Sequence, residues 1–184
     1  VLPNKTQDAD VGVVDGKIAE IGLLGDRNAK RRVDAANQYV FPGMIDPHVH
    51  LCHPFRDTRS VDDFYSGTCS AVAGGNTAII DFAIQWSGNP DEALSARLAE
   101  AKDKAIIDYA LHACFTKSDP SNIAYVSKII EQGVPSFKVY MVYGKQGRMM
   151  DDGGLLAMLQ AAAECGGIVN VHAENESIAD YNAI

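Results

Sequence analysis

The chain has 184 residues, 47% of them hydrophobic, and carries 24 acidic against 16 basic residues for a net charge of −8. The composition provides for one buried core, in one domain or one domain with a small annex. The acidic balance disfavours nucleic acid and anionic membranes as partners, since both require a basic surface. No apolar run is long enough to span a bilayer, so no membrane partner is expected.

Residues 1–40 predict the N-terminal part of a small β-sandwich annex. The dipeptide Asp15-Gly16 stands between two short apolar runs and is a strong signal for a two-residue hairpin. The expected strands cover 10–14, 17–21, 33–35 and 38–41. So few short strands cannot hold a core alone, and we expect the annex to need further strands from elsewhere in the protein.

Residues 41–184 alternate between strand and helix patterns. The expected strands are 41–50, 77–83, 109–115, 136–141 and 168–173, and the expected helices are 61–73, a helix from Pro90, 121–132 and 154–165. We expect Ser60 to cap the first helix and Asn89 the second. Five strands with four intervening helices predict a parallel sheet. No glycine-rich phosphate motif follows a strand, which argues against a dinucleotide or P-loop fold.

Polar residues gather at the carboxyl ends of these strands, where barrel enzymes keep their chemistry. The fold class we predict is therefore α/β, a (β/α)8 TIM barrel with about five βα units in this chain. Residues 41–184 would be the N-terminal part of that barrel. Because the chain starts at Val1 without methionine and stops at Ile184 in a predicted helix, we expect a fragment.

The end of the first predicted strand carries His48 and His50. If 44–50 is a strand, the two side chains point to one face and can chelate one metal ion. Imidazole nitrogen suits zinc and similar divalent ions. The alternative is a pair of structural histidines. His172 ends the fifth strand at the same end of the sheet, which favours a ligand role for it too.

Lys138 lies inside the apolar fourth strand. A buried lysine without a partner is costly and tends to lose its charge. One explanation is a buried salt bridge. The other is functional, because a neutral amine reacts with carbon dioxide to give a carbamate whose two oxygens can bridge two metals.

The chain resembles the cyclic amidohydrolases, most closely the dihydropyrimidinase and D-hydantoinase branch. The motifs that carry the resemblance are 41–50 (FPGMIDPHVH), 61–68 (VDDFYSGT), 73–82 (AGGNTAIIDF), 136–143 (SFKVYMVY) and 171–174 (VHAE). It implies two divalent metal ions, by default Zn2+. His48 and His50 would bind the first ion, His172 the second, and carbamylated Lys138 would bridge them.

The resemblance also implies the reaction. A metal-bridged hydroxide would hydrolyse the amide bond in a cyclic imide or ureide ring, a dihydropyrimidine or hydantoin. Tyr143 matches the family tyrosine that hydrogen-bonds the oxyanion, so Tyr143 and Lys138 are the expected catalytic residues. Cys52 stands where dihydroorotase-like members carry an arginine for the substrate carboxylate, which favours an uncharged substrate. The family further implies a homo-oligomer, a tetramer.

The family's remaining ligands, a sixth-strand histidine and an eighth-strand aspartate, lie on strands that this sequence does not contain. We expect His112 to be a packed barrel residue and His53 to line the mouth of the site. Two alternatives stay open: a non-catalytic fragment or related scaffold that acts by self-association, and an allantoinase-type hydrolase. The four scattered cysteines (Cys52, Cys69, Cys114 and Cys165) fit reduced thiols in a cytoplasmic protein.

Overall fold

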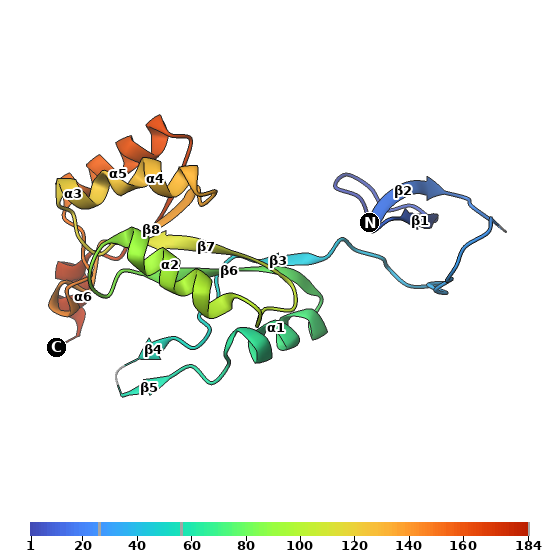
Figure 1. The fold of residues 1–184 in the computed structure, drawn as a ribbon, viewed down its shortest axis with the longest axis horizontal. Coiled ribbons are helices and arrows are strands. Elements are labelled where there is room, and N and C mark those ends of the chain that lie inside the picture. The colour runs from blue at the N-terminus through green and yellow to red at the C-terminus, as the bar shows by residue number, and fades with distance from the viewer. Residues whose placement is uncertain (26, 56, 184) are drawn as a thin grey trace. The chain divides into compact units, whose positions relative to one another are not determined.

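The computed structural model describes residues 1–25, 27–55 and 57–183 (Figure 1). The chain divides into two compact units, Val1–Gly43 and Met44–Ile184. In the first unit, β1 (Asp10–Val14) and β2 (Lys17–Gly22) form an antiparallel hairpin. Asp15 and Gly16 have φ angles of 50° and 74°, the left-handed conformation that a tight two-residue turn requires. The predicted hairpin is confirmed.

Two further strands predicted for this unit are wrong. Residues 33–35 and 38–41 form no strand. Among the described residues no strand pairs with them, and Tyr39 and Phe41 are mostly exposed. Apolar, β-prone residues form a strand only where a second strand satisfies their N–H and C=O groups. The β-sandwich annex therefore remains a prediction.

The second unit is a five-stranded parallel sheet covered by helices. Its strand order is β3-β6-β7-β8-β9, with β3 at Met44–Asp46, β6 at Asn76–Ile84, β7 at Asp108–Cys114, β8 at Ser136–Tyr140 and β9 at Ile168–His172. The helices are α1 (Phe64–Ala73), α2 (Pro90–Ala101), α3 (Pro120–Ile123), α4 (Tyr125–Glu131), α5 (Asp152–Glu164) and α6 (Glu176–Asn182). Consecutive strands lie side by side and the sheet curls, so the second unit is part of a βα barrel (Figure 1).

Helices α1 and α2 pack on β6, α2 also packs on β7, and α5 packs on β9 (Figure 1). The largest core cluster lies between strands and helices and includes Leu94, Leu111, Phe137, Val139 and Met158. Alternate residues of the same strands face the other side, where Phe82, Cys114 and Tyr140 form a smaller cluster. Because side chains alternate along a strand, His112 and Lys138 share this inner face. The alternation thus separates a packing face from a face that carries functional groups.

Local contacts explain where the elements depart from the predicted boundaries. The first strand is much shorter than 41–50, because Pro42 and Pro47 lack the N–H that a ladder needs. Helix α1 starts at Phe64, with Asp63 and not Ser60 as its cap. The hydroxyl of Ser60 is instead bonded to His50 and His53. The predicted cap of α2, Asn89 with Pro90 in the first turn, is confirmed.

The predicted helix 121–132 is two helices, α3 and α4, which meet at Ala124. Asp119 caps α3 with a bond to the Asn122 amide, and the second segment buries Val126 and Ile129. Short elements complete the unit: β4 (Pro54–Phe55), β5 (Thr58–Arg59) and the 3₁₀ turn η1 (Gly144–Gln146). None of the helices in the described part of the chain has the length and apolar character needed to cross a membrane.

Candidate active site

His48 and His50 face one another across a short gap. Their Nε2 atoms are 3.2 Å apart, and their ring planes are nearly perpendicular. Two nitrogens that each lie about 2.05 Å from one zinc ion and 3.2 Å from each other subtend an angle of about 100° at the metal, near the tetrahedral value. The pair therefore has the spacing of two ligands of a single ion.

The strand order and a local turn bring these two rings together. The assigned strand β3 ends at Asp46, yet the backbone stays aligned with β6, because the Val49 amide donates to the Ile80 carbonyl at 3.2 Å. The Asp46 carboxylate accepts a hydrogen bond from the His48 amide at 3.1 Å. His48 and His50 flank Val49 and so project to one side of the extended backbone.

The ring of Phe82, on β6, forms the floor under the histidines. Its centroid lies 4.6 Å from that of His48, 4.7 Å from that of His50 and 4.8 Å from that of His112. Burial lowers the pKa of His50 to about 4, with the neighbouring His53 as the next cause. Burial also lowers the pKa of His48, followed by the charge of Lys138. Both shifts favour the neutral imidazole, the form that binds a metal.

Lys138 lies on the inner face of β8 and is buried, with 7% of its surface exposed. Its ammonium lies 5.1 Å from the centroid of the Tyr140 ring. Burial lowers its pKa. Within residues 1–25, 27–55 and 57–183, no carboxylate forms an ion pair with this lysine. A buried salt bridge therefore has no support among these residues. The alternative, an amine that loses its charge and can act as a nucleophile, stays open.

His172 ends β9, and its Nε2 lies 2.8 Å from a carboxylate oxygen of Glu174. Because a carboxylate accepts, this Nε2 carries the proton and has no free lone pair for a metal. Tyr143 lies close to both β8 and β9: its ring centroid is 5.3 Å from that of His172 and 5.7 Å from that of Tyr140. Its φ of 73° is a left-handed conformation that a bulky residue rarely adopts.

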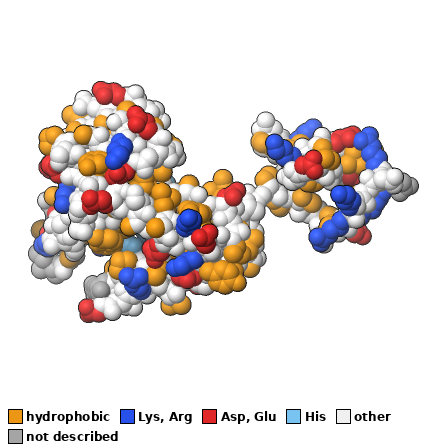
Figure 2. All heavy atoms as spheres, viewed as in Figure 1, with side chains coloured by type: hydrophobic (Ala, Val, Ile, Leu, Met, Phe, Trp, Pro, Cys, Tyr) orange, Lys and Arg blue, Asp and Glu red, His pale blue; other side chains and the backbone are white. Residues whose placement is uncertain are grey.

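The structure brings the predicted ligands to one face but does not close a metal cage. Among the described residues, no three His, Cys, Asp or Glu side chains converge closely enough to hold a metal ion. Histidine atoms are visible at one recessed spot among apolar side chains in Figure 2.

Of the other two histidines, His112 is packed as expected, whereas the place of His53 at the mouth of the site stays a prediction. His112 is buried, and its Nε2 donates to the Pro47 carbonyl at 2.9 Å while its Nδ1 accepts from the Ser136 hydroxyl at 2.6 Å. Both ring nitrogens are therefore occupied in packing β7 against its neighbours. His53 is half-buried against Trp86, with ring centroids 5.7 Å apart.

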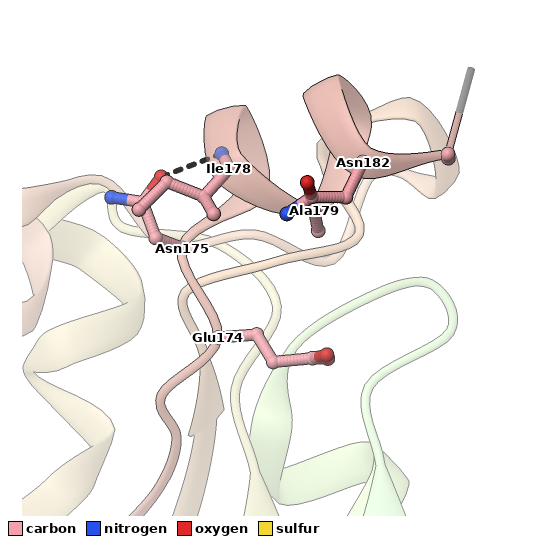
Figure 3. Close-up of a pocket in the computed structure, with 6 residues that line it drawn as sticks. Glu174, Asn175, Ile178, Ala179 and Asn182 are labelled. Atoms are coloured by element: carbon pink, nitrogen blue, oxygen red, sulfur yellow. Dashed lines mark hydrogen bonds between the residues drawn. The ribbon is translucent and has the colours of Figure 1, made fainter.

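Two cavities lie near these residues. One, of about 430 Å³, is lined by residues from the loop after β3, from the end of β6 and from α2, among them Cys52, His53 and Trp86. The second, of about 460 Å³, lies against α6 (Figure 3). Glu174, which bonds His172, lines it, and Asn175 turns its side chain back to cap α6. The first cavity is lined by His53 and Phe82, whose rings both contact that of His50, so it reaches the neighbourhood of the histidine pair.

Sequence reasoning missed the residues that support the site from behind. Phe82 was visible only as part of an apolar strand, and its contact with three histidines depends on strand order. Asp81 and Arg97 form an ion pair of 2.8 Å in which the Asp81 side chain is 1% exposed. The one available signal was a carboxylate within the apolar run 77–83, which a buried strand tolerates only when that carboxylate is paired.

Comparison with known proteins shows the family of the chain. The profile of the Amidohydrolase family matches residues 39–184. The D-hydantoinase of Geobacillus stearothermophilus is 44% identical over 176 residues, which cover 95% of this chain and 37% of that protein. The dihydropyrimidinase of Rattus norvegicus is 42% identical, over 92% of this chain and 34% of that protein.

Solved structures give the same result for the fold. A crystal structure of D-hydantoinase superposes with a TM-score of 0.89 at 41% identity, covering 97% of this chain and 39% of that one. The dihydropyrimidinase of Brevibacillus agri NCHU1002 also gives 0.89, at 35% identity with the same coverage. The predicted barrel class and the predicted resemblance are confirmed, and the chain spans less than two fifths of the length of these relatives. By its sequence profile, its relatives and its fold, this chain belongs to the amidohydrolase family.

Proposed function

We propose that the full-length protein carrying this chain hydrolyses the amide bond of a cyclic imide or ureide ring, a dihydropyrimidine or a hydantoin, with divalent metal ions. Water adds across the C–N bond: its oxygen joins the carbonyl carbon, the ring nitrogen gains a proton, and an open-chain ureido acid results. The observation that carries this proposal is the pair of Nε2 atoms, 3.2 Å apart, on the face of the sheet that also carries the buried Lys138. The names of the relatives, D-hydantoinase and dihydropyrimidinase, support the substrate class.

The residues present fit two divalent ions, with Zn2+ the first choice for imidazole ligands. His48 and His50 would hold one ion, and carbamylated Lys138 would bridge to a second. His172 would bind that second ion, either through Nδ1 or after Glu174 turns away from Nε2. Divalent ions in such a site supply Lewis acidity, which activates water and polarises an amide carbonyl.

Tyr143 is the residue we assign to the oxyanion that develops on the attacked carbonyl. A phenol O–H is a suitable donor for such a charge. The left-handed backbone at Tyr143 costs free energy, and strain of this kind gathers at functional sites. Its ring lies beside that of His172, so the same wall of the site would present a metal ligand and an oxyanion donor.

Cys52 favours an uncharged substrate, because a thiol cannot form the bidentate pair that arginine forms with a carboxylate. However, Arg59 reaches the same place from β5, where its guanidinium donates to the Cys52 sulfur at 3.0 Å. A guanidinium is thus within reach of the site mouth. The substrate panel must therefore include a carboxylated ring, dihydroorotate, beside the uncharged rings.

The test is metal analysis of the full-length protein together with hydrolysis assays on dihydrouracil, hydantoin, allantoin and dihydroorotate. We expect two divalent ions per chain and turnover of dihydrouracil or hydantoin. Turnover of allantoin alone would assign an allantoinase, and a metal-free, inactive protein would identify a non-catalytic scaffold. We further propose a homo-oligomer in the cytoplasm, which light scattering and cell fractionation would test.

A further inference from the structure

We propose that the buried Asp81–Arg97 ion pair is a positioning device: it holds the backbone of Leu51 and so sets the placement of the His48/His50 pair. The role assigned to the histidines rests on the proposed function. The contacts of the ion pair with Leu51 are observed directly in the structure and do not depend on the proposed function.

The ion pair forms hydrogen bonds with both backbone polar groups of Leu51, its N–H and its C=O. One carboxylate oxygen of Asp81 accepts from the Leu51 amide at 2.9 Å, and the other accepts from Arg97 at 2.8 Å. The same guanidinium nitrogen of Arg97 donates to the Leu51 carbonyl. Leu51 therefore has its N–H and its C=O bound to two side chains that are bound to each other. Since Leu51 follows His50 directly, its backbone limits how that imidazole can move.

The rest of the turn is held from nearby. The Ser60 hydroxyl donates to the His50 carbonyl at 2.8 Å and accepts from the His53 amide at 2.7 Å. The Cys52 amide donates to the Asp62 carbonyl at 2.6 Å. These contacts join residues of one loop, whereas Asp81 and Arg97 come from β6 and α2. The ion pair thus ties Leu51 to β6 and to α2, whereas the Val49 amide, bonded to Ile80, joins only the stretch before His50 to β6.

The ion pair acts from the opposite side of the sheet. Asp81 has the strand parity of Ala83, which faces the helices, while Phe82 faces the histidines. Arg97 stacks over the Phe64 ring at 4.5 Å, among core side chains. The two charged groups bond Leu51, and Asp81 also accepts from the Phe82 amide while Arg97 also pairs with Glu100. Neither bonds an imidazole, so their hold on the histidines passes through the backbone, above all that of Leu51, the residue next to His50.

Packing alone does not explain this ion pair. Burying two charges costs desolvation energy that apolar side chains of similar size avoid, and such replacements are often neutral or stabilising. The Arg97 Nε is buried without a hydrogen-bond partner in the described structure. What the two charges provide, and apolar residues cannot, is a directional hold on one amide and one carbonyl.

The test uses Asp81→Asn and Arg97→Lys in the full-length protein. The asparagine keeps the size of the side chain but has one acceptor oxygen where the carboxylate has two. The lysine keeps the positive charge but lacks the several N–H donors of the planar guanidinium. Each metal-free variant is titrated with Co2+, whose visible absorption reports the ligand geometry. We expect Co2+ affinity to fall by about tenfold or more, the size of loss typical when support for a ligand is removed, with a changed absorption spectrum.

Asp91→Asn is the matched control. It removes an ion pair of the same helix, Asp91 with Lys128 at 2.5 Å, that makes no contact with Leu51. Co2+ affinity should stay within about twofold of wild type, since partly exposed pairs contribute little. Equal losses in Asp81→Asn and Asp91→Asn would overturn the proposal, because they would mark a general loss of stability.

Amide hydrogen exchange at Leu51 gives a readout that needs no metal. We expect slow exchange in the wild type and clearly faster exchange in Asp81→Asn. If the wild type binds no Co2+, the proposed function fails, and the exchange rate alone tests whether the ion pair holds the Leu51 backbone. Equal exchange rates in the wild type and in Asp81→Asn would overturn the positioning role. If Asp81→Asn does not fold, Arg97→Lys decides by the same two measurements.

Discussion

Replacing Gly67 with alanine tests how tightly the turn after His50 is seated on α1. A Cβ at position 67 would lie 2.3 Å from Cδ2 of Leu51 and 3.1 Å from its Cδ1. Carbon atoms in contact are about 3.5 Å apart or more, so one methyl must move by roughly 1.2 Å. Leu51 has little freedom to move, because its side chain is 9% exposed and both of its backbone polar groups are bonded.

Two opposing terms set the size of the effect. Overpacking of a tight core costs about 1–3 kcal/mol. Alanine in place of glycine within a helix contributes about 1 kcal/mol in the other direction. We therefore expect Gly67→Ala to lower the free energy of unfolding by about 1 kcal/mol net, with a fall in Co2+ affinity at the His48/His50 pair.

A double-mutant cycle with Leu51→Ala isolates the clash. In the Leu51→Ala background the space is free, so Gly67→Ala should become stabilising by about 1 kcal/mol. The coupling energy would then be about 1–3 kcal/mol, measured by urea unfolding of the full-length protein. Gly153→Ala in α5 is the control, since the nearest atom to its Cβ lies at an ordinary 3.4 Å. A Gly67→Ala effect of equal size in both backgrounds would refute this account of the packing.

Three further predictions follow from the site and its supports. Lys138→Ala should remove both metal ions, measured by elemental analysis of the purified protein; retention of both would contradict the bridging carbamate. In the metal-free protein, NMR should find the His50 ring neutral down to about pH 4. This folded-state pKa lies below the unfolded value of 6.5. The contribution of His50 to the free energy of unfolding should therefore be complete above pH 6.5 and should decline as the pH falls toward 4. A free energy of unfolding that does not change across that window would contradict the lowered pKa of His50. Asn89→Ala should cost about 1 kcal/mol of unfolding free energy, because the side chain caps α2 at the Glu92 amide, and an unchanged unfolding midpoint would show that the cap contributes nothing.

The alternation of strands and helices was predictable because it depends on the order of apolar and polar residues within short segments. The hairpin at Asp15-Gly16 and the cap at Asn89-Pro90 depend on the backbone preferences of a few adjacent residues. Strand alternation likewise puts His112 on the face opposite Leu111, and Lys138 on the face opposite Phe137, within their own strands. Such features need no knowledge of distant neighbours, so the sequence alone determines them.

Features that depend on a distant partner were decided only in three dimensions. Residues 38–41 resemble a strand, but no strand in the described part of the chain pairs with them. Ser60 resembles a helix cap but bonds the turn at His50 and His53, because the chain folds back over that turn. Asp81 is 30 residues from Leu51, and the residues around Asp81 do not predict that it bonds the Leu51 amide.

For the site, the sequence by itself determined which residue types are present and on which strand ends. The tertiary structure decided how they face: His48 and His50 at metal-ligand spacing, Lys138 buried on the inner face of the sheet, and His172 bonded to Glu174. The physical reason is that a side chain's residue type is local, whereas its hydrogen-bond partner and its burial are set by the strands and helices packed around it.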